Sequence, residues 1–160
     1  MSARERPPYG SYAILVATYW GGLATAGLLG RLLRRSPYTS TPLDFAVLAA
    51  ANFKASRAIA RDRETSFARE PFVEGKAYDG EDEKPLQTGD MKQAVGELVT
   101  CTRCIGTWTA AGLTATQIVA PRFGRLLTWS LAASAATDFL LAGFTALTSK
   151  ANQLEEETDS

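Results

Sequence analysis

Four apolar runs, separated by polar segments, constrain most strongly what this chain can fold into. The runs occupy residues 11–30, 43–53, 105–120 and 126–148, while charged residues concentrate between them and near the C-terminal end. A helix needs about 20 predominantly apolar residues to cross the hydrocarbon core of a bilayer. The pattern therefore predicts an all-α integral membrane bundle of three or four helices that ends in a helical hairpin.

The first apolar run is predicted to be an uncleaved membrane anchor, so that residues 1–42 form an anchor helix and a turn. Residues 11–30 carry no charge, and the arginine-rich stretch after them lacks the small residues of a signal-peptide cleavage site. Gly22, Ala26 and Gly30 recur every four residues. Small residues on one side of a helix let a second helix approach closely in lipid, so we expect packing there.

The second apolar run leaves two arrangements open. Thr41 and Pro42 are predicted to begin a helix as its N-cap and first residue, but the uncharged part, Phe45–Phe53, is too short to span a bilayer alone. Arg57 and Arg61 follow at helical spacing. The segment is either a short membrane helix that ends in a basic collar or an amphipathic helix on the membrane surface, and we favour the first.

A polar loop is predicted over residues 62–90, inside a helical membrane domain that covers residues 43–148. The loop is rich in charge and glycine, a composition that buries little apolar surface. Asp90 is predicted to cap a following helix, with Gln93 as its capping-box partner. Beyond the domain, residues 149–160 form an acidic tail.

The last two apolar runs are predicted to form the hairpin. Residues 105–120 end at Pro121, and residues 122–125 are expected to form a tight turn before residues 126–148. A connection this short places two successive helices side by side in opposite directions.

Asp138 interrupts the last apolar run. A carboxylate in lipid is costly, and such a residue usually serves packing or transport. It can pair with an arginine, accept hydrogen bonds from the partner helix, or stay protonated; the candidate donors are Thr107, Thr109, Thr114 and Gln117. We favour an interhelical hydrogen bond that holds the packing, and keep a transport role as an alternative.

The two cysteines of the chain, Cys101 and Cys104, open the third apolar run together with Gly106 and Trp108. A C-x-x-C pair can close a static disulfide, cycle between dithiol and disulfide, or supply two thiolates to a metal site completed by another chain. If Cys104 lies at a helix N-terminus, the free backbone N–H groups and the helix dipole favour its thiolate. The sequence leaves these roles open.

Other function classes are disfavoured by what the chain lacks. It contains no histidine, the commonest general base and transition-metal ligand. Seventeen basic residues balance seventeen acidic ones, and no basic cluster is interleaved with aromatic residues, so no nucleic-acid surface is predicted. Phosphate-binding, dinucleotide-binding and hydrolase motifs are also missing. We therefore predict neither a cofactor nor an assigned reaction.

Several segments together resemble the family of small bacterial membrane proteins known as the domain of unknown function DUF1360. The resemblance covers roughly residues 43–145 and rests on a helix carrying Arg57, on Arg61–Thr65, on Arg69–Phe72, on Glu97–Cys101 and on Cys104–Trp108. Members of that family show an arginine-rich helix end and a C-x-x-C-x-G-x-W motif that opens a membrane helix. Since the family has no assigned activity, the resemblance implies a fold and a membrane location but no reaction.

We predict a structural or accessory subunit of the bacterial cytoplasmic membrane that packs against partner membrane helices or against a second copy. The close contacts would come from small residues: Gly22, Ala26 and Gly30, then Gly106 and Ala110, then Ala132 and Ala136. The alternative is a membrane thiol–disulfide redox protein that uses the cysteine pair. Anionic lipid headgroups are a further expected contact, for Arg57, Arg61 and Arg69.

The orientation depends on whether residues 43–60 span the membrane. By the positive-inside rule, Arg31, Arg34 and Arg35 place the first short loop in the cytoplasm. If residues 43–60 span, the cysteine pair faces the outside. If they lie on the surface, the pair faces the cytoplasm, where thiols are kept reduced.

Overall fold

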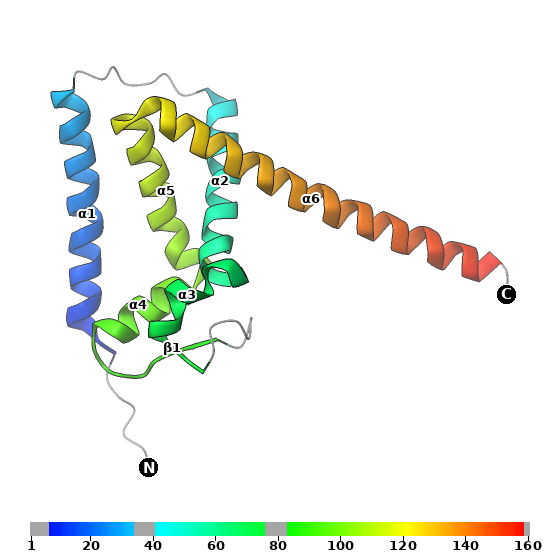
Figure 1. Cartoon of the computed structure of the whole chain (residues 1–160), viewed down its shortest axis with the longest axis horizontal. Helices are drawn as coiled ribbons and strands as arrows, with labels where there is room; N and C mark the ends of the chain where they lie inside the picture. The colour runs from blue at the N-terminus through cyan, green and yellow to red at the C-terminus, as the bar shows by residue number, and fades with distance from the viewer. Residues whose placement is uncertain (1–6, 34–40, 76–82, 159–160) are drawn as a thin grey trace, which may run out of the picture.

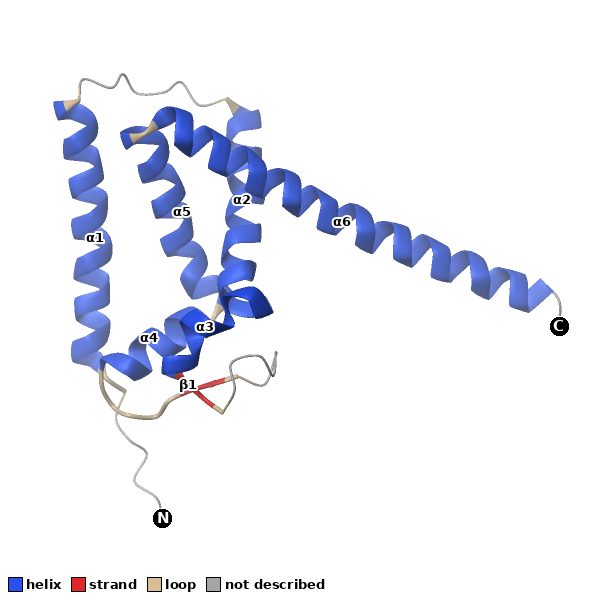
Figure 2. Cartoon of the chain, in the orientation of Figure 1, coloured by secondary structure: helices blue, strands red, loops and turns tan. Residues whose placement is uncertain are grey.

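The computed structural model describes residues 7–33, 41–75 and 83–158, and within them the chain is all-α apart from one two-stranded ladder (Figures 1 and 2). The helices are α1 (Tyr9–Leu32), α2 (Pro42–Arg61), α3 (Ser66–Arg69), α4 (Met91–Thr100), α5 (Thr102–Val119) and α6 (Pro121–Thr158). Two 3₁₀ turns, η1 (Arg63–Thr65) and η2 (Glu70–Phe72), and strands β1 (Val73–Glu74) and β2 (Lys84–Pro85) complete the described elements. The predicted all-α class is confirmed. The structure describes six helices where the sequence predicts a bundle of three or four; α4 is the helix predicted after Asp90, whereas α3 was not predicted.

Helices α2, α5 and the first half of α6 pack around a small core. Ala51, Leu113 and Ala132 form its buried centre, one residue from each helix. Two of the three are alanines, so the helices approach closely and the core holds little apolar volume. On α6 the buried alanines are Ala132 and Ala135, whereas Ala136 of the predicted pair is exposed.

Helix α1 packs against α5 through part of the predicted small-residue stripe (Figure 1). Ala26 and Gly30 are buried. A Cβ atom on Gly30 would lie 2.5 Å from the Ile118 Cγ2 atom of α5, so only glycine permits this approach. Gly22, in contrast, is exposed and has open space where a Cβ would stand. The stripe therefore makes its close contact only toward the C-terminal end of α1.

Helix α2 begins where the sequence predicts and runs alongside α5 (Figure 1). The Thr41 hydroxyl accepts a hydrogen bond from the Asp44 backbone N–H, and the Asp44 carboxylate accepts one from the Thr41 N–H. Pro42 takes the first helical position, where its missing N–H costs nothing. Helix α2 thus packs inside the helical bundle, against α5 and α6. It is not one of the described helices that are long and apolar enough to cross a membrane.

The turn between α5 and α6 differs from the prediction. A single residue, Ala120, separates the two helices, and residues 122–125 belong to the first turn of α6. Gly124 makes this possible, because a Cβ there would lie 2.6 Å from the Gln117 backbone nitrogen. The Gln117 side-chain amide then donates to the Thr128 hydroxyl at 2.9 Å, which joins the two helices just past the turn.

Helix α6 crosses α2 obliquely and continues beyond the bundle (Figure 1). Every residue from Phe139 to Glu155 is exposed. We call residues 139–158 the distal arm. The hairpin prediction therefore holds only for the first half of α6, and the acidic tail is helical as far as Thr158.

Two of the described helices, α1 and α6, are long and apolar enough to cross a membrane. Helix α5, which the sequence predicts as a span, does not reach the same mean hydropathy because threonines, Arg103 and Gln117 interrupt its apolar residues. Both qualifying helices keep most of their apolar surface exposed.

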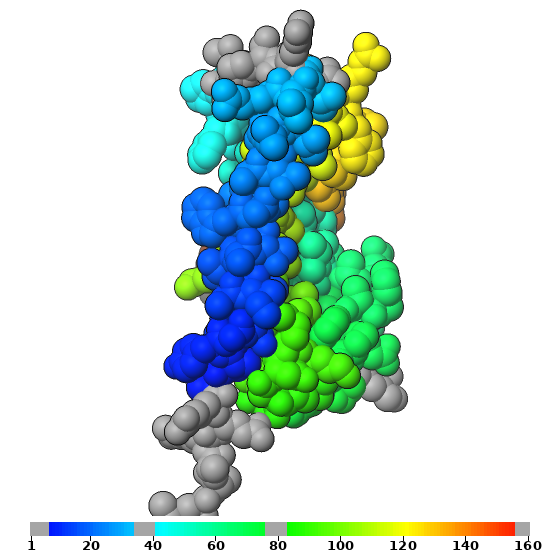
Figure 3. All heavy atoms as spheres, turned by 90° about the vertical axis from the view of Figure 1, so that its left-hand side faces the viewer, coloured from blue at the N-terminus to red at the C-terminus, as the bar shows by residue number. Residues whose placement is uncertain are grey.

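The remaining short elements close one end of the bundle, beside the N-terminal end of α1 (Figures 1 and 3). We call residues 62–75 and 83–100 the polar cap. Its strands pair in antiparallel register, Val73 with Pro85. Helix α4 lies so close to η2 that a Cβ on Gly96 would stand 2.5 Å from the Phe72 carbonyl oxygen. The polar cap therefore packs tightly, although the sequence predicts a loop over residues 62–90.

Candidate functional site

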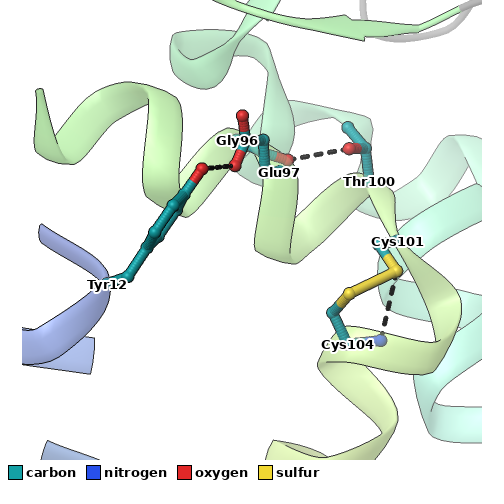
Figure 4. Close-up of a disulfide and its surroundings, with 6 residues drawn as sticks. All are labelled: Tyr12, Gly96, Glu97, Thr100, Cys101 and Cys104. Carbon is teal, nitrogen blue, oxygen red and sulfur yellow. Dashed lines mark hydrogen bonds between the residues drawn. A yellow bond between two sulfur atoms is a disulfide. The ribbon is translucent and has the colours of Figure 1, made fainter. Parts of the chain in front are cut away.

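The cysteine pair lies at the junction of α4 and α5 (Figure 4). Cys101 is the single residue between the helices and has an extended backbone, with φ −99° and ψ 104°. Its sulfur accepts a hydrogen bond from the Cys104 backbone N–H at 3.3 Å, so Cys101 is the N-cap of α5. The two residues form a disulfide with their Cα atoms 5.2 Å apart. The structure thus shows the disulfide form among the roles that the sequence left open.

The two sulfurs of this disulfide differ in environment. Cys104 and the neighbouring Arg103 are exposed, whereas Cys101 is half-buried behind them. Cys101 is also backed by the last turn of α4, where the Thr100 hydroxyl donates to the Gly96 carbonyl oxygen at 2.8 Å (Figure 4). Cys104 is therefore the more exposed residue of the pair, while the Cys101 sulfur caps the first turn of α5.

Gly106 and Trp108 hold the first turns of α5 in place. Gly106 faces α2, where a Cβ would meet the Ser56 Cβ atom at 3.7 Å. Trp108 faces α1 and contacts the Tyr19 ring edge-on, with ring centroids 5.5 Å apart. The next residue, Thr109, donates from its hydroxyl to the Asn52 side-chain oxygen on α2. The motif residues beyond the cysteines therefore anchor the disulfide on two neighbouring helices.

A second polar contact near the disulfide is not apparent from the sequence (Figure 4). The Tyr12 hydroxyl of α1 donates to the Glu97 carboxylate of α4. Glu97 also accepts from the Gln93 side-chain amide at 2.9 Å, and Gln93 in turn accepts from the Gly89 backbone N–H. The only sequence signal is a lone carboxylate between apolar residues on α4. This chain of hydrogen bonds ties the start of α1 to the polar cap.

Asp90 caps α4 as predicted. Its carboxylate accepts a hydrogen bond from the Lys92 backbone N–H at 2.8 Å and another from the Thr88 hydroxyl. These bonds, first that from Thr88 and then that from Lys92, lower the pKa of Asp90 because they stabilise the ionised form. Gln93 bonds Gly89 instead of the N-cap residue, so the predicted capping box is one residue out of register.

The sequence predicts that Arg69 contacts lipid headgroups, but the structure shows it buried. It is 1% exposed, and its Nε and Nη2 atoms donate to the Glu83 carboxylate at 2.9 and 3.0 Å. Its Nη1 atom donates to the carbonyl oxygens of Ile59 and Asp62, at the C-terminal end of α2. The guanidinium therefore caps α2 and fastens the polar cap to it. Arg57 and Arg61 are exposed and stay candidates for headgroup contact.

Asp138 forms an interhelical contact, but with a partner that the sequence did not indicate. Its carboxylate accepts a hydrogen bond from the Lys54 ammonium of α2 at 2.8 Å. Arginine and the threonine and glutamine donors of α5 were the expected partners. Beside this pair, the Phe53 and Phe139 rings stack with centroids 5.3 Å apart. The two contacts mark where α6 leaves α2.

The donor set for a metal is limited. Across residues 7–33, 41–75 and 83–158, no three cysteine, aspartate or glutamate side chains gather closely enough to hold an ion. The cysteines are joined to each other, and a disulfide has no thiolate to donate. A metal role for this pair would require reduction and ligands from a second chain.

The sequence model of one protein family, described as protein of unknown function (DUF1360), matches residues 47–143. No curated protein and no solved structure matches the chain. The matched region runs from the first turns of α2, through the polar cap and the disulfide, to the start of the distal arm. It leaves out α1 and most of the distal arm. Because the match covers more than half of its length, the chain belongs to the DUF1360 family, as the resemblance in its sequence predicted.

Proposed function

We propose that this protein is a small multi-pass protein of the bacterial cytoplasmic membrane that acts as a structural or accessory subunit. In this role it packs through the distal arm of α6 against a helix of another membrane protein or of a second copy. The single observation that carries the proposal is the exposure of the arm: Phe139, Leu140, Leu141, Phe144 and Leu147 are each at least 60% exposed.

Water is an unfavourable surrounding for such a helix. Burying one large apolar side chain is worth about 1.5–3 kcal/mol relative to leaving it in water, and this arm exposes five within three turns. A helix that is apolar all round is normally a membrane span or the centre of a large core. The arm has no such core around it in this chain, so a bilayer is the environment that fits.

The outer face of α1 supports the same surroundings. Ile14, Val16, Trp20 and Leu28 are all more than half exposed. With α2 and α5 alongside, the helices form a layer that has the polar cap at one end. The opposite end carries Arg31 and the first turn of α6, with Arg122 and Arg125 (Figure 1). Charged ends and an apolar middle are what a bilayer requires of a helical protein.

Partner helices, in addition to lipid, are supported by small residues on the arm. Ala142, Gly143 and Ala146 lie among its large apolar side chains, and a Cβ on Gly143 would meet nothing. Association of helices in lipid depends on close van der Waals packing, which small residues permit. At the polar end, exposed Arg57 and Arg61 offer two cations to anionic lipid headgroups.

The test uses the full chain in the membranes of cells that express it. A photo-reactive amino acid replaces Leu140 on the distal arm or, as the matched control, the similarly exposed Leu28 on α1. We expect a defined protein adduct from position 140 and little or none from position 28. The mass of the adduct then distinguishes a second copy from a different protein.

Two results would contradict the proposal. One is the release of the chain from membranes by an alkaline carbonate wash, which leaves integral proteins in place. The other is lipid labelling alone at position 140, which would make the arm a plain span without a partner. Replacing both Leu140 and Phe144 by alanine should abolish the adduct formed from a third arm position, Leu147.

A further inference from the structure

We propose that Cys101 and Cys104 exchange electrons with a dithiol of a second protein, and that Cys104 is the sulfur that forms the mixed disulfide. This activity goes beyond the structural role proposed above. It rests on three features of the site: the N-cap position of Cys101, the exposure of Cys104, and the anchoring of the first turns of α5.

The N-cap position makes Cys101 the better leaving group. Its sulfur accepts the Cys104 backbone N–H and lies at the positive end of an 18-residue helix. Both effects stabilise a negative charge on that sulfur. Thiol–disulfide exchange is faster when the departing thiol has the lower pKa. Attack on Cys104 releases Cys101, so this direction of cleavage is favoured.

Access favours the same direction. Cys104 is exposed, whereas Cys101 is half-buried at the end of α4. The attacking sulfur must approach the target sulfur from the side opposite the departing one, which requires open space beside Cys104 and not beside Cys101. Exposed Arg103, next to Cys104 in the chain, adds a positive charge that attracts an incoming thiolate.

A partner thiolate attacks the Cys104 sulfur, the bond between Cys104 and Cys101 breaks, and Cys101 departs as a thiolate that takes a proton from water. The second partner thiolate then attacks the partner sulfur of the mixed disulfide and releases Cys104 as a thiolate, which is also protonated. The partner dithiol loses two electrons and two protons and becomes a disulfide, and the chain gains them. The reverse sequence reduces a partner disulfide.

Anchoring keeps the two thiols together after reduction. Gly106 packs on Ser56, Trp108 contacts Tyr19, and the Thr109 hydroxyl bonds a side chain of α2. The helix turn that carries Cys104 is therefore held from two sides when the sulfur–sulfur bond opens. The site also lies beside the polar cap, at the end of the bundle, where a folded partner protein can reach it (Figures 1 and 4).

The experiment uses the oxidised wild-type chain in detergent, with reduced glutathione as the probe. Acid stops the reaction early, the freed thiols are alkylated, and mass spectrometry of the peptides shows whether glutathione is attached to Cys104 or to Cys101. Cys101→Ser, which keeps a good N-cap residue, and Cys104→Ser supply the two singly modified standards. The control for an ordinary thiol is Gln87→Cys in a chain lacking both native cysteines, because Gln87 is exposed in the polar cap.

We expect at least tenfold more chains with glutathione on Cys104 and a free Cys101 than chains with the opposite pattern. The wild-type pair should become half-reduced at a glutathione ratio that buffers can reach. Equal amounts, or more glutathione on Cys101, would overturn the assignment of the exchanging sulfur. A wild-type disulfide that resists every glutathione ratio would overturn the redox activity itself and make the bond structural. Neither result would change the adduct expected at the distal arm.

Discussion

The polar cap buries charged and polar groups inside the chain, whereas the distal arm leaves apolar side chains exposed. Residues 62–90 of the cap look like a loop in the sequence, yet the cap buries an arginine at 1% exposure and bonds its guanidinium to Glu83 and to two carbonyl oxygens at the C-terminal end of α2. The first half of the arm, residues 139–148, is made of apolar residues that look like a core helix, yet every arm residue is exposed as far as Glu155. The polar groups of the cap find their hydrogen-bond partners within one chain, whereas the apolar side chains of the arm need lipid or another protein to be buried.

The comparison shows which part of the molecule is stabilised by contacts within the chain alone. A buried ion pair stays satisfied only if its geometry is complete, since each charge loses its water. The cap supplies that geometry from residues of one chain. The burial of apolar surface is non-directional, so it is favourable against any apolar neighbour, whether lipid or protein.

Removing the buried arginine should break the cap. We expect Arg69→Met to lower the free energy of unfolding by about 3–5 kcal/mol, because Glu83 would keep a buried charge without a partner. Thermal unfolding followed by circular dichroism in detergent measures the loss. The double variant Arg69→Met with Glu83→Leu should lose less than the single variant. An effect of Arg69→Met no larger than that of Arg57→Met, at an exposed position, would contradict the buried pair.

Enlarging one alanine should locate the boundary between the packed and the free parts of α6. Ala135 is 0% exposed, so Ala135→Leu should overpack the buried side of α6 and cost about 1–3 kcal/mol. The same change at its exposed neighbour, Ala136→Leu, should stay within about 0.5 kcal/mol of the wild type. Denaturant unfolding of both variants gives the comparison. Similar losses would mean that α6 is covered on both sides.

Neutralising Asp138 should loosen the point where α6 leaves α2. The pair with Lys54 is 2.8 Å long, but 42% of the Asp138 side chain is exposed. A pair this open is worth about 1 kcal/mol or less. We expect Asp138→Asn to lower stability by that amount, and Lys54→Met to add little once Asp138 is gone. A double-mutant cycle measures the coupling, and its absence would assign the crossing to the stacked Phe53 and Phe139 rings.

The smallest expected effect is on the pH dependence of the cap. Hydrogen bonds from Thr88 and the Lys92 N–H lower the pKa of Asp90 in the folded chain. The stability that its carboxylate contributes is therefore present above the ordinary carboxyl pKa of about 4 and lost as pH falls through the lower folded value. Asp90→Asn keeps an N-cap residue without titrating. Unfolding curves of the two proteins should converge below pH 4, and a constant difference would contradict the assignment.

Local chemistry made several features predictable. The threonine before Pro42 and the aspartate before α4 both cap helices as expected, since a capping side chain bonds a backbone N–H only two or three residues away. The sequence also predicts helix boundaries at Pro42 and Pro121. In contrast, it does not predict the exact turn before α6, because only the approach of Gly124 to the Gln117 backbone shows that residues 122–125 are helical.

Sequence alone predicts the helical class, the family, the starts of α2 and α4, and the two cysteines able to form a disulfide. Each depends on residues close together in the chain or on a pattern of apolar runs. Only the tertiary structure decided that Arg69 is buried, that Tyr12 bonds Glu97 across 85 residues, and that Lys54 pairs with Asp138 across 84. The physical reason is that such pairs depend on how helices dock, and docking is set by the shape of many side chains together.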